Sequence, residues 1–454
     1  MTSQRHEILQ ELTAKMRTGR MTRRTFLERS VALGISSGAA LSLLDACGSS
    51  SASTANITYW NLFGGGDGVR MVEMQNSFQK TYPNIPLEAI TLAWGAPYYT
   101  KLSMASVGGR PPEVGIMHLS RMLAYAEGDL LDPFDLNELA AFDITPDNFL
   151  PSLWERTQYK GKVYAIPLDT HPFVMYYNVD IAKKAGLLGA DGKLKTLQGA
   201  TEVINAFKAA QQVTGGLGLS TTGAWRLFDA LYGQLGGSPI LSKDGRTLTI
   251  DDAKAEQALA FMADLTTGSK VASPTVTSDY AGSVAVFGSG KAGFFWNGEW
   301  EVTTFLGQKI HFDMVPFPNI LGGNQTFGDS HTFILPRQAT VDKDRRKATL
   351  QFISFMLKNS LTWAQGGHIP AYQPVAVSDA YKKLSPQSHY ADVAQYVIPD
   401  PPAWFSGAGS QFETVADGDF QTVLAGQLKP HQALQQFKVS VQKFLDTPPP
   451  VGNV

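Results

Sequence analysis

A strand, a glycine-rich turn, a helix and a second strand follow one another in residues 57–89, and this order is the strongest constraint on the fold. Residues 57–60 form a β-rich run, and glycines at positions 64–66 and 68 mark a turn. Apolar residues in 69–78 then recur at helical spacing, until Pro83 ends the helix. Alternating apolar residues in 85–89 predict the second strand. A βαβ unit of this kind predicts an α/β protein whose sheet is covered by helices.

Apolar runs and helical patterns alternate along the rest of the chain. The predicted strands are 114–117, 163–167, 173–177, 292–296 and 333–335, and the predicted helices include 253–265 and 348–357. A chain of 454 residues has room for two or three domains. Hydrophobic residues make up 43% of it, with 25 Phe, 15 Tyr and 8 Trp, so a large core is expected.

Charge and cysteine content exclude several function classes. The 38 basic and 40 acidic side chains leave a net charge of -2, so the chain lacks the basic surplus that nucleic-acid binding requires. The single cysteine, Cys47, cannot form an internal disulfide, a cysteine-rich zinc site or an iron–sulfur cluster. Nucleic acid is therefore not an expected partner, and thiol redox chemistry is not an expected activity.

Motifs for catalysis and cofactors are incomplete. The glycines of 64–68 lack the spacing of a dinucleotide loop, because Val69 and Met71 stand where glycines would be needed. Residues 288–291 resemble part of a phosphate-binding loop, but Ala285 and Ala292 replace two of its required residues. Neither a metalloprotease helix nor a nucleophile elbow occurs, and the eight histidines show no metal-ligand spacing. We therefore expect no cofactor, no metal and no enzymatic activity.

The N-terminal region has the pattern of an export signal. Residues 31–44 form an uncharged apolar run of 14 residues, shorter than the roughly 20 that span a bilayer. Arg23 and Arg24 precede it as a twin-arginine pair, and Cys47 follows it in a sequence similar to a lipobox. We interpret 1–46 as a twin-arginine lipoprotein signal peptide, Cys47 as the lipidated residue and 47–55 as a flexible spacer. Translation could start at Met1 or at Met21.

Six blocks, in order, resemble the family 1 extracellular solute-binding proteins, the sugar-binding subunits of ABC importers. Residues 287–302, FGSGKAGFFWNGEWEV, are similar to the family's signature and are the most specific block. Tyr177, Asn178 and Asp180 match the family's Y-N-x-D pattern after the hinge. The remaining blocks cover residues 57–88, 110–135, 164–187, 328–337 with 352–375, and 420–445.

This resemblance implies an α/β, two-lobe, periplasmic-binding-protein-like fold of the class II type, with a hinge and a ligand cleft between the lobes. Lobe 1 is expected at 56–168 plus 317–366, and lobe 2 at 172–316 plus 371–454. The implied function is a lipoprotein on the outer face of the cytoplasmic membrane that hands a di- or oligosaccharide to an ABC permease. The implied protein is a monomer, attached to the membrane only by its lipid.

A sugar site needs flat aromatic side chains and paired hydrogen-bonding groups. Trp300 stands where the family's signature tryptophan does, although it could also be core. Asp67 could be a plain N-cap, Arg121 a surface ion-pair partner and His171 a hinge histidine. The proposed ligand-binding residues are Asn61, Phe63, Asp67, Trp94, Tyr98, Ser120, Arg121, Asp169, His171, Trp225, Trp300, Asp329, His331, Trp404 and Phe405. The last two could form an aromatic lid or simply pack.

Two rival functions stay open. The same fold could bind a glycerophosphodiester or another polyol phosphate, but that ligand would want several cationic contacts, and Arg121 and Arg226 are the only candidates. A secreted glycoside hydrolase would need two converging carboxylates, which Asp67, Asp169 and Asp329 could supply.

Overall fold

The computed structural model describes residues 55–449. The expectations for the signal peptide, for Arg23, Arg24 and Cys47, and for nearly all of the spacer lie outside the described residues. In the described part, no helix is both long enough and apolar enough to cross a bilayer.

The first sheet confirms the predicted βαβ unit. It contains β2 (Leu87–Thr91), β1 (Ile57–Asn61), β3 (Val114–His118), β13 (His331–Pro336) and β4 (Leu131–Asp132) in that order, with β7 (Ala165–Pro167) beside β13. β1 is parallel to both β2 and β3, and the helix α4 (Gly65–Thr81) connects β1 to β2. β13 comes from much later in the chain and runs antiparallel to β3. The sheet is therefore completed by a segment that returns to it.

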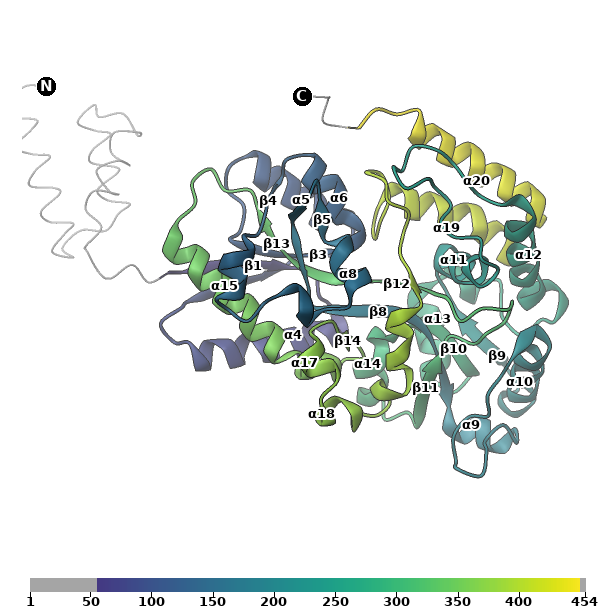
Figure 1. Ribbon diagram of the computed structural model, residues 1–454. Helices are drawn as coiled ribbons and strands as arrows, with labels where there is room; N and C mark the ends of the chain where they lie inside the picture. The colour runs from purple at the N-terminus through teal and green to yellow at the C-terminus, as the bar shows by residue number, and fades with distance from the viewer. Residues whose placement is uncertain (1–54, 450–454) are drawn as a thin grey trace, which may run out of the picture. The chain divides into compact units, whose positions relative to one another are not determined.

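Helices cover the first sheet on two sides. In Figure 1, α5 (Ala96–Val107) and α6 (Leu119–Glu127) lie above its strands, and α4 and α15 (Lys343–Lys358) lie below them. Phe78 of α4 packs against Phe352 of α15 with ring centroids 5.0 Å apart, and Phe352 is 5.0 Å from Tyr59 of β1. These side chains are fully buried, so this face of the sheet is held by aromatic packing.

The second sheet is built on one long strand. Its order is β15 (Val397–Ile398), β12 (Thr326–Asp329), β8 (Asp169–Asn178), β10 (Ala292–Gly298) and β9 (Leu217–Thr221), and β11 (Phe312–Pro316) and β14 (Ile369–Pro370) also pair with β8. The helices that follow or flank these strands are α9 (Val179–Lys184), α10 (Gly199–Thr214), α11 (Ala224–Gln234), α12 (Asp252–Ala263), α13 (Tyr280–Gly288), α14 (Val302–Gly307), α19 (Gln411–Leu424) and α20 (Pro430–Leu445). Phe228 of α11 lies 4.2 Å from Phe420 of α19, in the middle of the larger core.

Short elements complete the described chain. They are α7 (Leu136–Ala140), α8 (Pro151–Arg156), α16 (Ser360–Ala364), α17 (Gln373–Ala376), α18 (Asp379–Lys382) and the hairpin of β5 (Gln158–Tyr159) and β6 (Lys162–Val163).

The chain passes between the two sheets three times. It leaves β7 through Leu168 into β8, returns from β12 through Ser330 into β13, and passes from α16, which packs on α4, into β14. The second crossing comes later than the expected position 317, because β12 pairs with β8 and Phe327 packs in the core of the second sheet.

Candidate functional site

A cavity of about 750 Å³ lies where the chain crosses between the sheets. Its lining residues near the first sheet include Phe63, Asp67, Trp94, His118 and His331. Its lining residues near the second sheet include His171, Arg226, Tyr280, Asn297, Trp300, Glu301, Asp329, Glu413 and Asp417. Both lobes therefore contribute aromatic, hydrogen-bonding and charged side chains to one space.

Tyr280 organises the aromatic wall on the second lobe. Its hydroxyl accepts hydrogen bonds from Trp300 Nε1 at 2.6 Å and from Asn297 Nδ2 at 3.2 Å, and it donates to Glu301. The guanidinium of Arg226 lies 5.4 Å from the centre of the Trp300 ring. Trp300 is thus fixed in orientation while one part of it stays exposed to the cavity.

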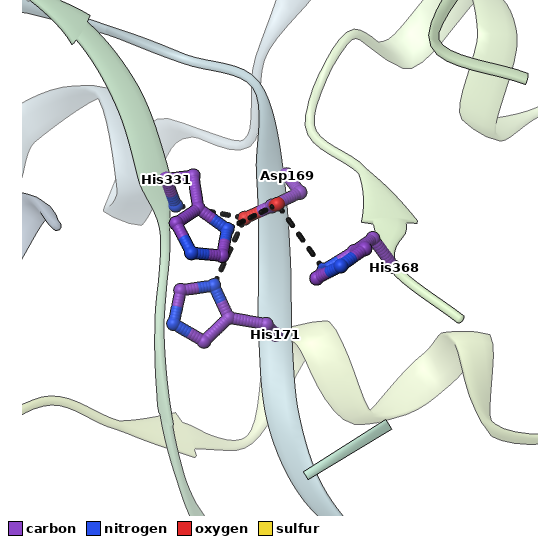
Figure 2. Close-up of side chains that lie close together, drawn as sticks. All are labelled: Asp169, His171, His331 and His368. Carbon is purple, nitrogen blue, oxygen red and sulfur yellow. Dashed lines mark hydrogen bonds and ion pairs between the residues drawn. The ribbon is translucent and has the colours of Figure 1, made fainter. Parts of the chain in front are cut away.

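Asp169 is the centre of a buried polar cluster at the crossing (Figure 2). Its Oδ1 accepts hydrogen bonds from His171 Nδ1 at 3.0 Å and from the His331 backbone N–H at 2.8 Å. Its Oδ2 accepts hydrogen bonds from His331 Nδ1 at 2.7 Å and Trp363 Nε1 at 2.6 Å, and His368 Nδ1 lies 3.3 Å away. Burial raises the pKa of Asp169, but the three histidines outweigh burial and hold that pKa well below its usual range.

His368 links this cluster to both lobes. Its Nε2 donates to Asp67 Oδ1 at 3.0 Å, and its Nδ1 lies 2.9 Å from Glu299 Oε1. Burial lowers the pKa of His368, but Asp67, Glu299 and Asp169 together raise it well above its usual value. Burial raises the pKa of Glu299 to about 7 against the attraction of His368. The ring of Trp363 stacks on His368 at 4.2 Å and covers one face of it.

The wall of the cavity that α11 and α19 form carries one arginine among carboxylates. Arg226 donates to Glu413 Oε1 through Nε at 3.1 Å and Nη2 at 2.8 Å. Asp417 accepts from the Trp225 backbone N–H at 2.7 Å, and burial together with Glu413 raises the pKa of Asp417 to about 6. The positive charge on this wall is therefore already paired before any ligand arrives.

Seven of the proposed ligand-binding residues line the cavity. They are Phe63, Asp67, Trp94, His171, Trp300, Asp329 and His331. Trp94 stands at the rim with 48% of its surface exposed. The structure thus brings together residues from four of the six blocks that carried the resemblance.

Five further candidates lie behind the lining. Asn61 is buried and accepts hydrogen bonds from Phe63 N–H and Thr91 Oγ1, so it shapes the turn. Tyr98 is fully buried, and its hydroxyl bonds to the Ile116 carbonyl. Asp169 is enclosed by the histidines. The other two are Ser120, which donates to Asp329, and Arg121, whose guanidinium lies 4.6 Å over the Tyr99 ring.

Three proposed aromatic contacts belong to the second core instead. Trp225 is fully buried among Phe412, Phe420 and Phe437, and its Nε1 donates to Asp400 Oδ1 at 2.9 Å. Phe405 is buried and stacks on Phe444 at 5.2 Å, and Trp404 packs against the same core. Among the described residues, these three rings are therefore absent from the cavity lining, and Trp404 and Phe405 pack rather than form a lid.

Several lining residues were missed from the sequence. Arg226 was considered only as a cationic contact for a phosphate ligand, and His118, which ends β3, was left out of the proposed set. Asn297 lies in the signature block 287–302 but was not chosen. Tyr280, Glu413 and Asp417 carry no local sequence pattern of a binding site. The sequence also gave no sign of a histidine cluster, yet ligand-type atoms of Asp169, His171, His331 and His368 all lie within 4.8 Å of one another.

Comparisons with known proteins agree with this architecture. The GacH receptor of Streptomyces glaucescens GLA.O, solved unliganded and with acarbose, superposes with a TM-score of 0.74 at 18% identity, covering 86% of this chain and 98% of that one. The expected two-lobe α/β fold is confirmed.

The relatives found by sequence are also solute-binding proteins. A maltooligosaccharide ABC transporter solute-binding lipoprotein of Streptococcus pneumoniae serotype 4 is 23% identical over 60% of this chain, and an arabinooligosaccharide-binding protein of Bacillus subtilis is 27% identical over 46% of it. These matches span only 62% and 47% of the lengths of the two relatives. The family model for bacterial extracellular solute-binding proteins matches residues 73–385, more than half of the chain. The chain therefore belongs to the bacterial extracellular solute-binding protein family.

Proposed function

We propose that this protein is the substrate-binding subunit of an ABC importer and captures a di- or oligosaccharide between its lobes. The observation that carries the proposal is the cavity itself, in which the exposed part of Trp300 faces a space ringed by hydrogen-bonding side chains of both lobes. An indole face suits the C–H face of a sugar ring, and the polar ring suits its hydroxyls. The relatives named above bind oligosaccharides, which supports the same ligand class here.

Closure of the lobes is the proposed capture step. The three crossings lie beside the cavity, so a small rotation about them brings the walls together without breaking either sheet. The permease of the importer is the proposed partner, and a monomer is the proposed state.

An ionic phosphate ligand fits this cavity poorly. Among the residues that the structure describes, Arg226 is the only lysine or arginine in the lining, and Glu413 already pairs with it. Asp67, Glu301, Asp329, Glu413 and Asp417 line the same space. A phosphodiester would therefore approach five carboxylates for one occupied guanidinium, and a neutral sugar avoids that repulsion.

Hydrolysis is not part of the proposal, because the three carboxylates that the sequence offered for it are engaged in hydrogen bonds. Asp67 accepts from His368, and Asp169 accepts from two histidines and Trp363. Asp329 accepts from the backbone N–H groups of Ser120 at 3.1 Å and Ser330 at 2.9 Å. A glycoside hydrolase keeps one carboxyl group free to protonate the leaving oxygen.

Attachment to the outer face of the membrane through Cys47 is proposed from the sequence. Cys47→Ala should release the protein from the membrane fraction, whereas Arg23→Lys with Arg24→Lys should leave unprocessed protein inside the cell. Sedimentation with membranes despite Cys47→Ala would rule out Cys47 as the anchor, and normal export of the double variant would rule out the twin-arginine route.

A thermal-shift screen tests the ligand class. Maltooligosaccharides and arabinooligosaccharides of two to five units are compared with sn-glycerol 3-phosphate and glycerophosphocholine at equal concentrations. Binding to the native state alone raises Tm with ligand concentration, so at least one oligosaccharide should produce a rising shift. A shift with the phosphates and none with the sugars would overturn the proposal.

A further inference from the structure

Three histidines meet side by side in the wall of the cavity, from three different strands. His118 ends β3, His171 lies near the start of β8 and His331 begins β13. The ring centroids are 4.7 Å apart for His118 and His331, 5.5 Å for His118 and His171, and 4.2 Å for His171 and His331. All three residues line the cavity.

Each of these rings is held by its Nδ1 atom. Asp169 binds Nδ1 of His171 at 3.0 Å and of His331 at 2.7 Å, and the Tyr99 hydroxyl lies 2.7 Å from Nδ1 of His118. Among residues 55–449, no Nε2 of the three forms a hydrogen bond with the protein. Figure 2 shows the rings of His171 and His331 with the second nitrogen turned to the same side, away from Asp169. The fold thus leaves three imidazole nitrogens without a protein partner.

This arrangement has the features of a three-histidine metal site. A metal that binds three Nε2 atoms tetrahedrally, at about 2.0–2.1 Å from each, places the ring centroids about 5 Å apart. The observed separations of 4.2, 4.7 and 5.5 Å bracket that spacing. Metal-binding histidines also usually donate their other ring N–H to a carboxylate or a similar acceptor, which is the part that Asp169 takes for His171 and His331. The Tyr99 hydroxyl holds the ring of His118 at its Nδ1.

Asp169 itself is a poor position for the ion, although it belongs to a group of ligand-type atoms that all lie within 4.8 Å of one another. Its two oxygens already accept hydrogen bonds from the His331 backbone N–H and from Trp363 Nε1 as well as from the rings. His368 is held between Asp67 and Glu299, so its ring is committed to carboxylates. The metal position is therefore on the cavity side of the rings, with Asp169 behind them.

Local charge favours a cation at that position. The carboxylates of Asp67, Asp169 and Glu299 all contact His368, and Asp329 lines the cavity beside the rings. A divalent cation would be attracted by these carboxylates.

We propose that His118, His171 and His331 bind a divalent transition metal of the zinc class through their Nε2 atoms. Three protein ligands leave one coordination position toward the cavity, for water or for an oxygen atom of the bound solute. Imidazole is a common ligand of Zn²⁺, Co²⁺ and Ni²⁺, so these ions are suitable probes.

Calorimetric titration of ZnCl₂ into the chelator-treated, tag-free protein tests the site, and Co²⁺ absorption reports its coordination. We expect one ion per chain and the visible absorption of four-coordinate Co²⁺. His171→Gln and His118→Gln should each weaken binding at least tenfold, and Tyr99→Phe should weaken it by about 10-fold to 100-fold. Circular dichroism checks that each variant is folded.

His311→Gln and His431→Gln are the matched controls, because these histidines are exposed and each faces a single carboxylate. They should leave the affinity within about twofold of the wild type. Absence of Zn²⁺ binding to the wild type, or binding that survives His171→Gln and is lost in a control variant, would overturn the proposal. Octahedral Co²⁺ absorption in the wild type would equally contradict a three-histidine site.

Discussion

Asp169 and His331 are joined by two hydrogen bonds, Oδ1 to the backbone N–H at 2.8 Å and Oδ2 to Nδ1 at 2.7 Å. Each residue begins a strand directly after a crossing between the sheets, Asp169 in β8 and His331 in β13. The pair therefore ties two of the three crossings together at the wall of the cavity. Asp169 is fully buried, and its low pKa keeps it ionised at neutral pH.

Asp169→Asn should strongly destabilise the protein. It removes a buried negative charge from the histidines and presents an amide N–H₂ to groups that also donate. Loss of one partner from a buried charged cluster costs about 3–5 kcal/mol of unfolding free energy. Urea denaturation followed by circular dichroism measures the change, and exposed Asp147→Asn is the control. A loss below about 1 kcal/mol would show that the charge at Asp169 is unimportant for the fold.

Trp225→Ala should act on folding rather than on the ligand. Trp225 is fully buried among phenylalanines, so its removal leaves a cavity and should cost about 3–5 kcal/mol. The ligand-free Tm should fall clearly, and the residual native protein should still shift upward with ligand. An unchanged Tm with lost binding would return Trp225 to the ligand site.

Trp300→Ala should give the opposite pattern. Trp300 is partly exposed at the cavity, and its Nε1 bonds to Tyr280 rather than to the core. The ligand-free Tm should stay within a few degrees of the wild type, whereas binding should weaken by about 2–4 kcal/mol. Trp404→Ala, outside the cavity lining, is the matched control. Full affinity in Trp300→Ala would contradict the proposed stacking surface.

The free energy of unfolding should fall as the pH rises from about 4 to about 8, because the Asp400 carboxyl stays protonated in the native state over this range. Burial, with Glu413 and Asp329, raises the pKa of Asp400 to about 8, and nearby Asp229 is also buried with a raised pKa. In the unfolded chain the pKa of Asp is about 4, so between these values the native state holds the extra proton and loses stability as pH increases.

Asp400→Asn tests this pH dependence, because an amide can still accept from Trp225 Nε1 through its oxygen. The variant should be more stable than the wild type at pH 8.5 by more than about 1 kcal/mol, and its stability should vary less between pH 5 and 8.5. Denaturation curves at several pH values provide the measurement. Parallel pH profiles for the two proteins would contradict the raised pKa.

Local sequence patterns were enough to predict several strands and helices of the scaffold. Each predicted element has an apolar periodicity that can be read within a single segment of the chain. The βαβ opening is present as β1, α4 and β2, the helix predicted at 348–357 as α15, and the strand predicted at 292–296 as β10. Trp225 was misread because it follows a glycine turn, while its burial depends on α19 and α20, which come nearly 200 residues later. Such burial is decided by tertiary packing, not by neighbours in sequence.

The three histidines in the cavity wall could not be grouped from their spacing in the sequence. His118, His171 and His331 lie on separate strands, and the crossing of the chain between the sheets is what brings them together. A local metal motif places its ligands on one helix or one loop, so a pattern search along the chain does not detect a site assembled from three strand ends. The resemblance helped where it carried a residue directly, as for Trp300.

Calorimetric titration of the wild-type protein with maltooligosaccharides and arabinooligosaccharides tests the central claim most directly, that the cavity between the lobes binds a carbohydrate. We predict saturable binding of at least one oligosaccharide with one site per chain, and its loss in Trp300→Ala but not in Trp404→Ala. No saturable heat with any of these sugars, in a protein shown to be folded by its thermal transition, would contradict the claim.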